Sequence, residues 1–294
     1  MMPIRPSTRR PRAARWLTLA IGLAALPGAA RAQSPNAPAP NPAAAPRDAL
    51  PTVFYIGDST VRNGRGDGAN GQWGWGDLTA GYFDTTRVHV VNKALGGRSS
   101  RTYLTQGYWE QVRATLRKGD VVIMQFGHND AGALNDTSRA RGSIRGTGEE
   151  TEAIDNLITH QHEVVHSFGW YLRRYIADAR AAGATPIVAS LVPRNYWENG
   201  TVKRNAADYA GWAEQVARDA KVRFIDLNAL IARRYDAMGE DSVRALFVED
   251  RTHTTLAGAQ LAARVVVAAL RGMPDDPIAP YLSAEGAAVA PMRR

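Results

Sequence analysis

The first apolar run after a Pro- and Ala-rich segment is Thr52-Val53-Phe54-Tyr55-Ile56. It is short and rich in β-branched and aromatic residues, which is typical of a strand buried on both faces of a sheet. Four later runs have the same character and are also predicted to be strands: Val88–Val91, Val121–Phe126, Pro186–Leu191 and Val222–Ile225.

Longer segments with helical periodicity separate these runs. The predicted helices are Tyr103–Arg117, Val165–Ala182, Asn205–Ala220, Asn228–Met238 and Thr254–Leu270. This alternation of strand and helix predicts an α/β fold with three layers, α/β/α, around a central parallel sheet of about five strands. In such sheets ligands bind outside the carboxyl ends of the strands, so the residues after each strand are the candidates for function.

Residues 1–32 are predicted to be a secretory signal peptide. An Arg-rich start precedes an apolar stretch from Trp16 to Leu26, and cleavage is expected after the triplet Ala30-Arg31-Ala32. A membrane anchor is the weaker alternative, because the apolar stretch is shorter than the ~20 residues of a spanning helix. The Arg9-Arg10 pair leaves Sec and twin-arginine export both open. We therefore expect an exported protein, periplasmic or secreted, with no membrane attachment after cleavage.

The rest of the chain divides by composition. Residues 33–50 contain Pro, Ala and Asn with few large apolar groups, and we expect a disordered linker there. Residues 51–273 are predicted to form one folded domain. Residues 274–294, which begin Pro274-Asp275-Asp276-Pro277 and continue Ala-rich, are expected to be a loosely attached tail.

The charge balance argues against nucleic acid as a partner. The 36 Lys and Arg residues exceed the 28 Asp and Glu residues, for a formal net charge of +8, but the excess is concentrated in residues 1–32. The remainder is nearly neutral and lacks the clustered basic face of a nucleic-acid binder. The absence of cysteine excludes disulfides, thiolate nucleophiles and Cys-based metal sites. The sequence makes no prediction of oligomeric state.

Polar segments follow the first three predicted strands and precede the last predicted helix. They are Gly57-Asp58-Ser59-Thr60, Asn92-Lys93-Ala94-Leu95-Gly96-Gly97-Arg98-Ser99, Gly127-His128-Asn129-Asp130 and Asp250-Arg251-Thr252-His253. In order and content the four segments resemble the sequence blocks of the SGNH, or GDSL, hydrolase superfamily. The resemblance implies a flavodoxin-like SGNH hydrolase fold and makes residues 51–273 the catalytic domain of an esterase.

Other segments narrow the resemblance to one branch. Four strings are similar to rhamnogalacturonan acetylesterases, and so is Thr60 in place of the commoner leucine. They are Gly96-Gly97-Arg98-Ser99-Ser100-Arg101-Thr102-Tyr103, Gln125-Phe126-Gly127-His128-Asn129-Asp130, Arg141-Gly142-Ser143-Ile144-Arg145-Gly146-Thr147-Gly148-Glu149-Glu150-Thr151 and Gly169-Trp170-Tyr171-Leu172-Arg173-Arg174-Tyr175. This similarity implies removal of O-acetyl groups from a plant cell-wall polysaccharide without a metal or organic cofactor.

The chemistry of ester hydrolysis assigns roles to three of these residues. A serine hydroxyl needs an imidazole to take its proton, and the imidazole needs a carboxylate to fix its tautomer. Ser59, His253 and Asp250 supply these groups, and the spacing of Asp250 and His253 allows both to lie on one side of a turn. The alternative is that Asp250 only caps the helix and His253 is exposed. We assign Asp58, next to the nucleophile, to structural hydrogen bonds in the turn.

The resemblance also implies the donors that would bind the oxyanion of the tetrahedral intermediate. They are the backbone N–H groups of Ser59 and Gly97 and the side-chain amide of Asn129. A glycine at position 97 lets the backbone approach a ligand closely.

Substrate contacts are predicted on weaker grounds. Arg98 and Arg101 follow the second strand, and arginine matches the carboxylates of an acidic polysaccharide, although structural ion pairs are an alternative for each. His166 is a candidate for the edge of the substrate site or for packing. Tyr196 and Trp197 are among the aromatic residues that could stack on sugars. His160, His162 and His166 form a cluster, but no carboxylate pattern accompanies them, so we expect no metal site.

Three functions remain after these arguments. The first is a carbohydrate O-acetylesterase acting on rhamnogalacturonan. The second is an SGNH esterase for another acyl ester, such as acetylated xylan, peptidoglycan or a small ester. The third is a non-catalytic carbohydrate-binding protein that shares the fold, a possibility because fold alone does not establish activity.

Overall fold

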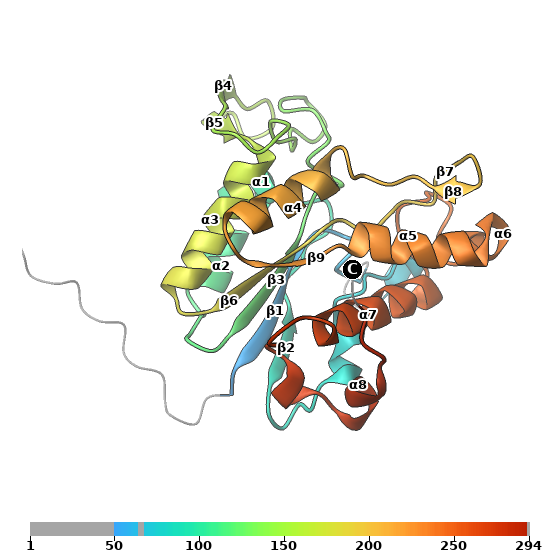
Figure 1. The fold of residues 1–294 in the computed structure, drawn as a ribbon. Helices are drawn as coiled ribbons and strands as arrows, with labels where there is room; N and C mark the ends of the chain where they lie inside the picture. Colours follow the sequence, from blue (N-terminus) through green and yellow to red (C-terminus); the bar gives the residue numbers. More distant parts are fainter. Residues whose placement is uncertain (1–49, 64–67, 293–294) are drawn as a thin grey trace, which may run out of the picture. The chain divides into compact units, whose positions relative to one another are not determined.

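Five parallel strands form the central sheet (Figure 1), and loops at their carboxyl ends carry the candidate site. The computed structural model describes residues 50–63 and 68–292. The predicted signal peptide and almost all of the predicted linker lie outside these residues. The strands of the sheet are β1 (Thr52–Gly57), β2 (His89–Asn92), β3 (Val121–Gln125), β6 (Thr185–Ala189) and β9 (Arg223–Ile225).

The strand order is β2-β1-β3-β6-β9. The chain therefore leaves β1 in one direction to form β2 and returns to the other side of β1 to form β3. A doubly wound sheet of this order has its ligand crevice at this switch point, between the loops that follow β1 and β3. The predicted flavodoxin-like α/β/α fold is confirmed.

Helices cover both faces of the sheet (Figure 1). On one face pack α1 (Ser100–Thr105), α2 (Tyr108–Arg113), α3 (Phe168–Ala181) and α4 (Tyr209–Asp219), and on the other α5 (Leu227–Met238), α7 (Leu256–Arg271) and the 3-10 helix η2 (Asp77–Tyr82). The shorter elements are η1 (Ala69–Gly71), α6 (Glu240–Arg244), η3 (Ala279–Tyr281) and α8 (Ala284–Ala288).

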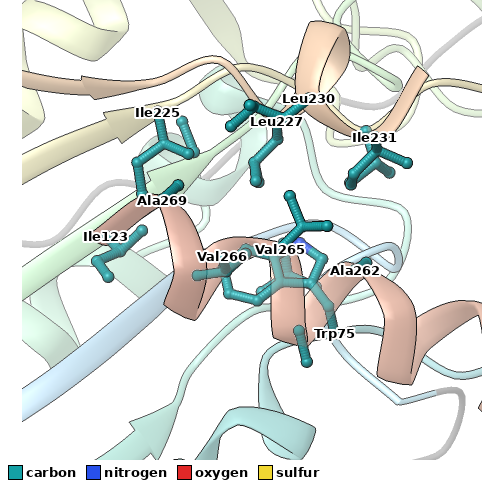
Figure 2. Packing of buried hydrophobic residues seen from close by; sticks show 14 of the residues in the cluster. Trp75, Ile123, Ile225, Leu227, Leu230, Ile231, Ala262, Val265, Val266 and Ala269 are labelled. Atoms are coloured by element: carbon teal, nitrogen blue, oxygen red, sulfur yellow. The ribbon is translucent and has the colours of Figure 1, made fainter. Parts of the chain in front are cut away.

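The alternation of side chains along each strand builds two hydrophobic cores. Val53 and Tyr55 of β1 belong to the core beneath α5 and α7, whereas Phe54 and Ile56 belong to the core beneath α1 to α4. Figure 2 shows the first core, where residues of α7 such as Val266 pack near residues of the sheet. Each fully buried aliphatic side chain of this kind contributes about 1.5–3 kcal/mol to stability.

Two antiparallel hairpins lie outside the central sheet, and the sequence did not predict them. One consists of β4 (Thr151–Asp155) and β5 (His162–His166), and the other of β7 (Trp197–Glu198) and β8 (Thr201–Val202). The first corrects the predicted helix Val165–Ala182, which begins only at Phe168. Exposed polar side chains alternate with few apolar ones along β4 and β5, so neither strand has an apolar run.

Two further expectations are corrected. The predicted helix Tyr103–Arg117 is two helices, because Gly107 adopts a left-handed φ of 78° between α1 and α2. Residues 274–292 are not loosely attached: Ile278 and Val289 are buried, and Leu282 pairs with Phe83 at the end of η2. Among the described residues, no helix is both long enough and apolar enough to cross a membrane.

Candidate active site

Ser59 lies in a tight turn two residues after β1. The carbonyl of Asp58 accepts hydrogen bonds from the backbone N–H groups of Val61 and Arg62, at 3.2 and 3.1 Å. The buried Asp58 carboxylate accepts two more from Thr60, from its N–H at 2.8 Å and its hydroxyl at 2.7 Å. Burial acts to raise the pKa of Asp58, but nearby His128 and the bonds from Thr60 outweigh burial and lower it. Asp58 thus has bonds that hold the turn, the structural role assigned to it.

Side-chain hydrogen bonds connect this turn to the neighbouring strand. The Thr60 hydroxyl, which donates to Asp58, accepts a bond from Nε2 of Gln125 at 2.7 Å. Oε1 of Gln125 in turn accepts from the indole N–H of Trp75 at 2.9 Å. All four side chains are buried. A leucine at position 60 could neither donate to Asp58 nor accept from Gln125, so threonine is what makes this network continuous.

His253 reaches Ser59 from the loop before α7. Its Nε2 lies 2.7 Å from the Ser59 hydroxyl oxygen, and its Nδ1 bonds to Oδ2 of Asp250. The other oxygen of Asp250 accepts the backbone N–H groups of Thr252 and His253, each at 2.9 Å. Partial burial acts to raise the pKa of Asp250, but the bonds from His253 and Thr252 outweigh it and hold the pKa below its ordinary value. The three predicted residues therefore form one hydrogen-bonded chain.

The loop that carries His253 is fixed to the segment that follows the serine turn. Thr254 and Trp73 form an isolated antiparallel β-bridge. The N–H of Trp73 donates to the carbonyl of Thr254 at 2.9 Å, and the Thr254 hydroxyl donates to the carbonyl of Trp73 at 2.7 Å. These two bonds hold the imidazole loop beside the serine.

The predicted oxyanion donors come from the loops after β1, β2 and β3. Gly97 has a φ of 76°, a left-handed conformation that favours glycine. One N–H of the Asn129 amide donates to the carbonyl of Arg98 at 2.8 Å, which leaves the second available to a ligand. Among the described residues, the backbone N–H groups of Ser59 and Gly97 have no acceptor.

These groups open into one cavity of about 630 Å³, here called the first cavity. Four arginines are part of its wall, namely Arg98, Arg139, Arg141 and Arg194. No aspartate or glutamate occurs among its described lining residues. Burial, together with the charge of Arg139, lowers the pKa of Arg141, although a guanidinium keeps its proton in proteins. A cavity with this lining favours an anionic ligand.

The three predicted substrate residues lie in different surroundings. Arg98 lines the first cavity, where its Nη2 donates to the Tyr108 hydroxyl at 3.2 Å. Arg101 is fully buried and forms a bidentate ion pair with Glu163, which corrects its prediction as a substrate contact in favour of the structural ion pair. His166 is not among the described residues of the first cavity. Its ring stacks on Trp170 with 3.7 Å between centroids, the packing alternative.

The histidine cluster does not converge. His160 occupies the turn of the β4–β5 hairpin with a φ of 56°, and exposed His162 pairs with Asp155. In the part of the chain that the structure describes, no three His, Cys, Asp or Glu side chains are grouped to hold a metal ion.

Sequence reasoning missed several residues of the first cavity. His128 lies in the polar segment that follows the third predicted strand. Arg141 is the first residue of one of the strings that are similar to rhamnogalacturonan acetylesterases. Arg194 follows β6, so the rule of inspecting each strand end could have found it. Arg139 had no such signal, because it lies in an irregular loop.

The fold and the site together define the chain as an ester hydrolase of the SGNH type. The profile of the GDSL-like Lipase/Acylhydrolase family matches residues 55–261, and the chain belongs to this family. It is 34% identical to the rhamnogalacturonan acetylesterase of Emericella nidulans over 213 residues, which are 72% of this chain and 81% of that protein. It is 30% identical to a Bacillus subtilis protein named "Probable rhamnogalacturonan acetylesterase YesY", over 76% of this chain and 94% of that one.

A crystal structure of the Bacillus subtilis protein YXIM shares the fold. The TM-score is 0.60 at 24% sequence identity, and the match covers 74% of this chain and 55% of that one. This chain thus corresponds to about half of the solved protein. The similarity adds independent support to the architecture described above.

Proposed function

We propose that the protein is a carbohydrate O-acetylesterase and that its substrate is acetylated rhamnogalacturonan. The observation that carries the proposal is the hydrogen-bonded chain of Ser59, His253 and Asp250 at the wall of an arginine-lined cavity. Rhamnogalacturonan contains galacturonate residues, whose carboxylates complement arginine. The names of two relatives point to the same polymer.

The proposed reaction has two halves. The Ser59 oxygen attacks the acetyl carbonyl while Nε2 of His253 takes the hydroxyl proton, and the negative charge collects on the former carbonyl oxygen. The amide of Asn129 and the N–H groups of Ser59 and Gly97 donate to this oxygen. The C–O bond to the sugar breaks, and the sugar oxygen receives the proton from His253. Water then attacks the acetyl-serine while His253 takes a proton from it. The bond between the Ser59 oxygen and the acetyl carbon breaks, the Ser59 oxygen receives that proton from His253, and acetic acid leaves as acetate after losing its own proton to solvent.

Acetate release tests the chemical part of the proposal. Wild type should release acetate from the polysaccharide, and Ser59→Ala should release none while its circular dichroism spectrum stays unchanged. An active Ser59→Ala variant would exclude Ser59 as the nucleophile. A fluorophosphonate should label the wild type covalently and leave Ser59→Ala unlabelled, which distinguishes an enzyme from a non-catalytic binding protein.

A substrate panel tests the polymer. Acetylated rhamnogalacturonan, acetylated xylan and O-acetylated peptidoglycan are compared at equal acetyl concentration. We expect the highest kcat/KM on the first, and we expect that value alone to fall steeply with added salt, because ions screen attraction between the arginines and the polymer. Equal rates on rhamnogalacturonan and xylan would remove the pectic assignment and leave a general acetylesterase.

We also propose that the protein is exported. The support is the sequence pattern of residues 1–32, with predicted cleavage after Ala32. Export matches a substrate that is too large to enter a cell. Cell fractionation with amino-terminal sequencing tests the proposal: we expect protein that begins at Gln33 in the periplasm or the medium, and recovery of the protein only from the cytoplasm would contradict it.

A further inference from the structure

A second cavity of about 490 Å³ adjoins the first and has no role in the reaction described above. The two cavities share His128 and Arg194 as lining residues. The other walls of the second cavity come from the segments after β3 and β6, Arg145, the β7–β8 hairpin with the residues that follow it, and the start of α4. The crevice at the carboxyl ends of the strands therefore continues past the site of ester cleavage.

Two polar atoms in the residues that line this cavity lack partners. The hydroxyl of Tyr209 and Oδ1 of Asp208 are buried, and neither has a hydrogen-bond partner among the described residues. Most buried polar groups in folded proteins are paired, so an unpaired donor and acceptor at a cavity wall point to a ligand. The position of Tyr209 is fixed by packing, because the residue is buried and its ring meets the ring of Phe168 edge to face with 5.1 Å between centroids.

Aromatic rings and cations complete the lining, and two of these cations, Arg145 and the shared Arg194, form no ion pair with a described carboxylate. The Trp197 indole is held in place by its N–H, which donates to Asn195 at 2.8 Å, and Tyr196 is 41% exposed. The Arg145 guanidinium lies 5.9 Å from the ring centroid of Tyr209. Lys203 is neutralised by Glu198 at 2.8 Å. In contrast, Arg145 forms no ion pair with any described carboxylate, so its charge is available to a ligand.

We propose that the second cavity binds a uronate sugar of the same polysaccharide chain, one or two residues away from the acetylated sugar. Tyr209 and Asp208 pair with its hydroxyl groups, Arg145 pairs with its carboxylate, and Trp197 offers an apolar face to the ring. This inference rests on the proposed function, because it needs an acetylated polysaccharide in the first cavity. It implies an enzyme that recognises a stretch of polymer rather than a single acetylated sugar.

The test compares three substrates for each protein variant. The substrates are p-nitrophenyl acetate, acetylated rhamnogalacturonan oligosaccharides, and the same oligosaccharides with their carboxyl groups reduced to alcohols. The variants are Tyr209→Phe and Arg145→Gln. Arg244→Gln is the matched control, because Arg244 is an exposed arginine on α6, outside both cavities.

Both cavity variants should keep the wild-type rate on p-nitrophenyl acetate, which also shows that they are folded. On the native oligosaccharides each should lose about tenfold in kcat/KM, as expected for a lost hydrogen bond to a charged or buried group. On the reduced oligosaccharides the ratio between wild type and Arg145→Gln should fall to about one, while Tyr209→Phe should still show its loss. The control should match wild type throughout.

Two outcomes would overturn the inference while leaving the proposed function intact. Wild-type rates for both cavity variants on native oligosaccharides would show that the second cavity binds no part of the substrate. An equal loss for Arg145→Gln on native and reduced oligosaccharides would show that it recognises no carboxylate. Failure of the proposed function looks different, because wild type itself would then release no acetate from any oligosaccharide.

Discussion

The carboxylate of Asp250 bonds to His253 twice, through one oxygen to the backbone N–H and through the other to the ring Nδ1. The backbone bond fixes where the carboxylate lies, and the ring bond fixes which nitrogen carries the proton. Nε2, which faces Ser59, is then the nitrogen with a lone pair. Orientation and tautomer are therefore both set by one side chain.

Replacing this carboxylate with an amide should damage the base without removing it. Asp250→Asn can keep the backbone bond, but its NH₂ group can favour the imidazole tautomer with the proton on Nε2. We expect kcat to fall about 10³- to 10⁴-fold, as in serine hydrolases of this design. Hydrolysis of p-nitrophenyl acetate measures the change. Glu249→Gln, at the exposed neighbouring acid, is the matched control. A loss below tenfold would contradict an orienting role.

The acid limb of the pH profile should contain no contribution from Asp250. The lowered pKa of Asp250 keeps that carboxylate ionised as pH falls, so the orienting bond to His253 is retained. A protonated His253 cannot accept the Ser59 proton, and activity is lost. A plot of log kcat/KM against pH should rise with a slope of one and then level off. A slope of two would require a second group.

Asn129 should matter to the transition state more than to the bound substrate. Its amide is oriented by the carbonyl of Arg98 and has one N–H left to donate. Asn129→Ala should lower kcat about 10²- to 10³-fold with little change in KM, as for removal of one oxyanion donor. Steady-state kinetics on an aryl acetate separates the two parameters. A raised KM with unchanged kcat would instead assign Asn129 to substrate binding.

The buried pair of Arg101 and Glu163 should affect stability and not substrate recognition. Arg101→Met leaves the partly buried Glu163 without its cation, which we expect to cost about 3–5 kcal/mol in the free energy of unfolding. Adding Glu163→Gln should recover part of that loss. Urea unfolding measures both variants, and KM on oligosaccharides should match wild type. An unchanged stability with a raised KM would restore Arg101 as a substrate contact.

Asp130 should make stability fall as pH rises through weak acid. Burial raises its pKa to about 6, against an ordinary value of 3.8, despite hydrogen bonds from Ser100 and Ser143. Between these two values the folded protein holds a proton that the unfolded chain has lost, so its stability declines with rising pH by about 1.4 kcal/mol per unit. Asp130→Asn lacks this proton. The stability of wild type relative to Asp130→Asn should therefore drop from pH 4 to pH 6 in urea titrations. A constant difference would contradict the raised pKa.

The central sheet was predictable because its inner strands β1, β3 and β6 are buried on both faces, and because the partly buried edge strands β2 and β9 still contain adjacent apolar residues. Such strands read as continuous apolar runs, and the predicted ends lie within two residues of those observed. The β4–β5 hairpin was not predictable, since its strands are largely exposed and follow no apolar run. For the C-terminal segment the error was the opposite one, because a loosely attached tail was predicted and a packed segment is observed. Ile278 and Val289 are buried, but their sequence neighbours are rich in Ala and Pro. Two isolated apolar residues in such a segment do not predict that it packs against the domain.

Residues of the candidate site that directly follow a strand of the sheet could be predicted from the sequence. The direction in which each side chain points could not. Ser59 and Asn129 follow adjacent parallel strands, so their proximity follows from topology. Arg98 and Arg101 are three residues apart, yet one lines the first cavity and the other pairs with Glu163, 62 positions away. The sequence does not contain the position of that hairpin carboxylate, so it could not separate the two arginines.

Ser59 and His253 bond to each other across 194 positions of the chain, and the bridge between Trp73 and Thr254 closes the same long loop. A polypeptide still growing on the ribosome therefore has a serine without a base until almost the whole domain has been made. The same is true of any partly folded chain in which α7 has not docked. The rate at which hydrolysis of a chromogenic acetate appears during refolding would therefore measure the last step of folding. Esterase activity shows that the segment around Ser59 and the segment around His253 have come together.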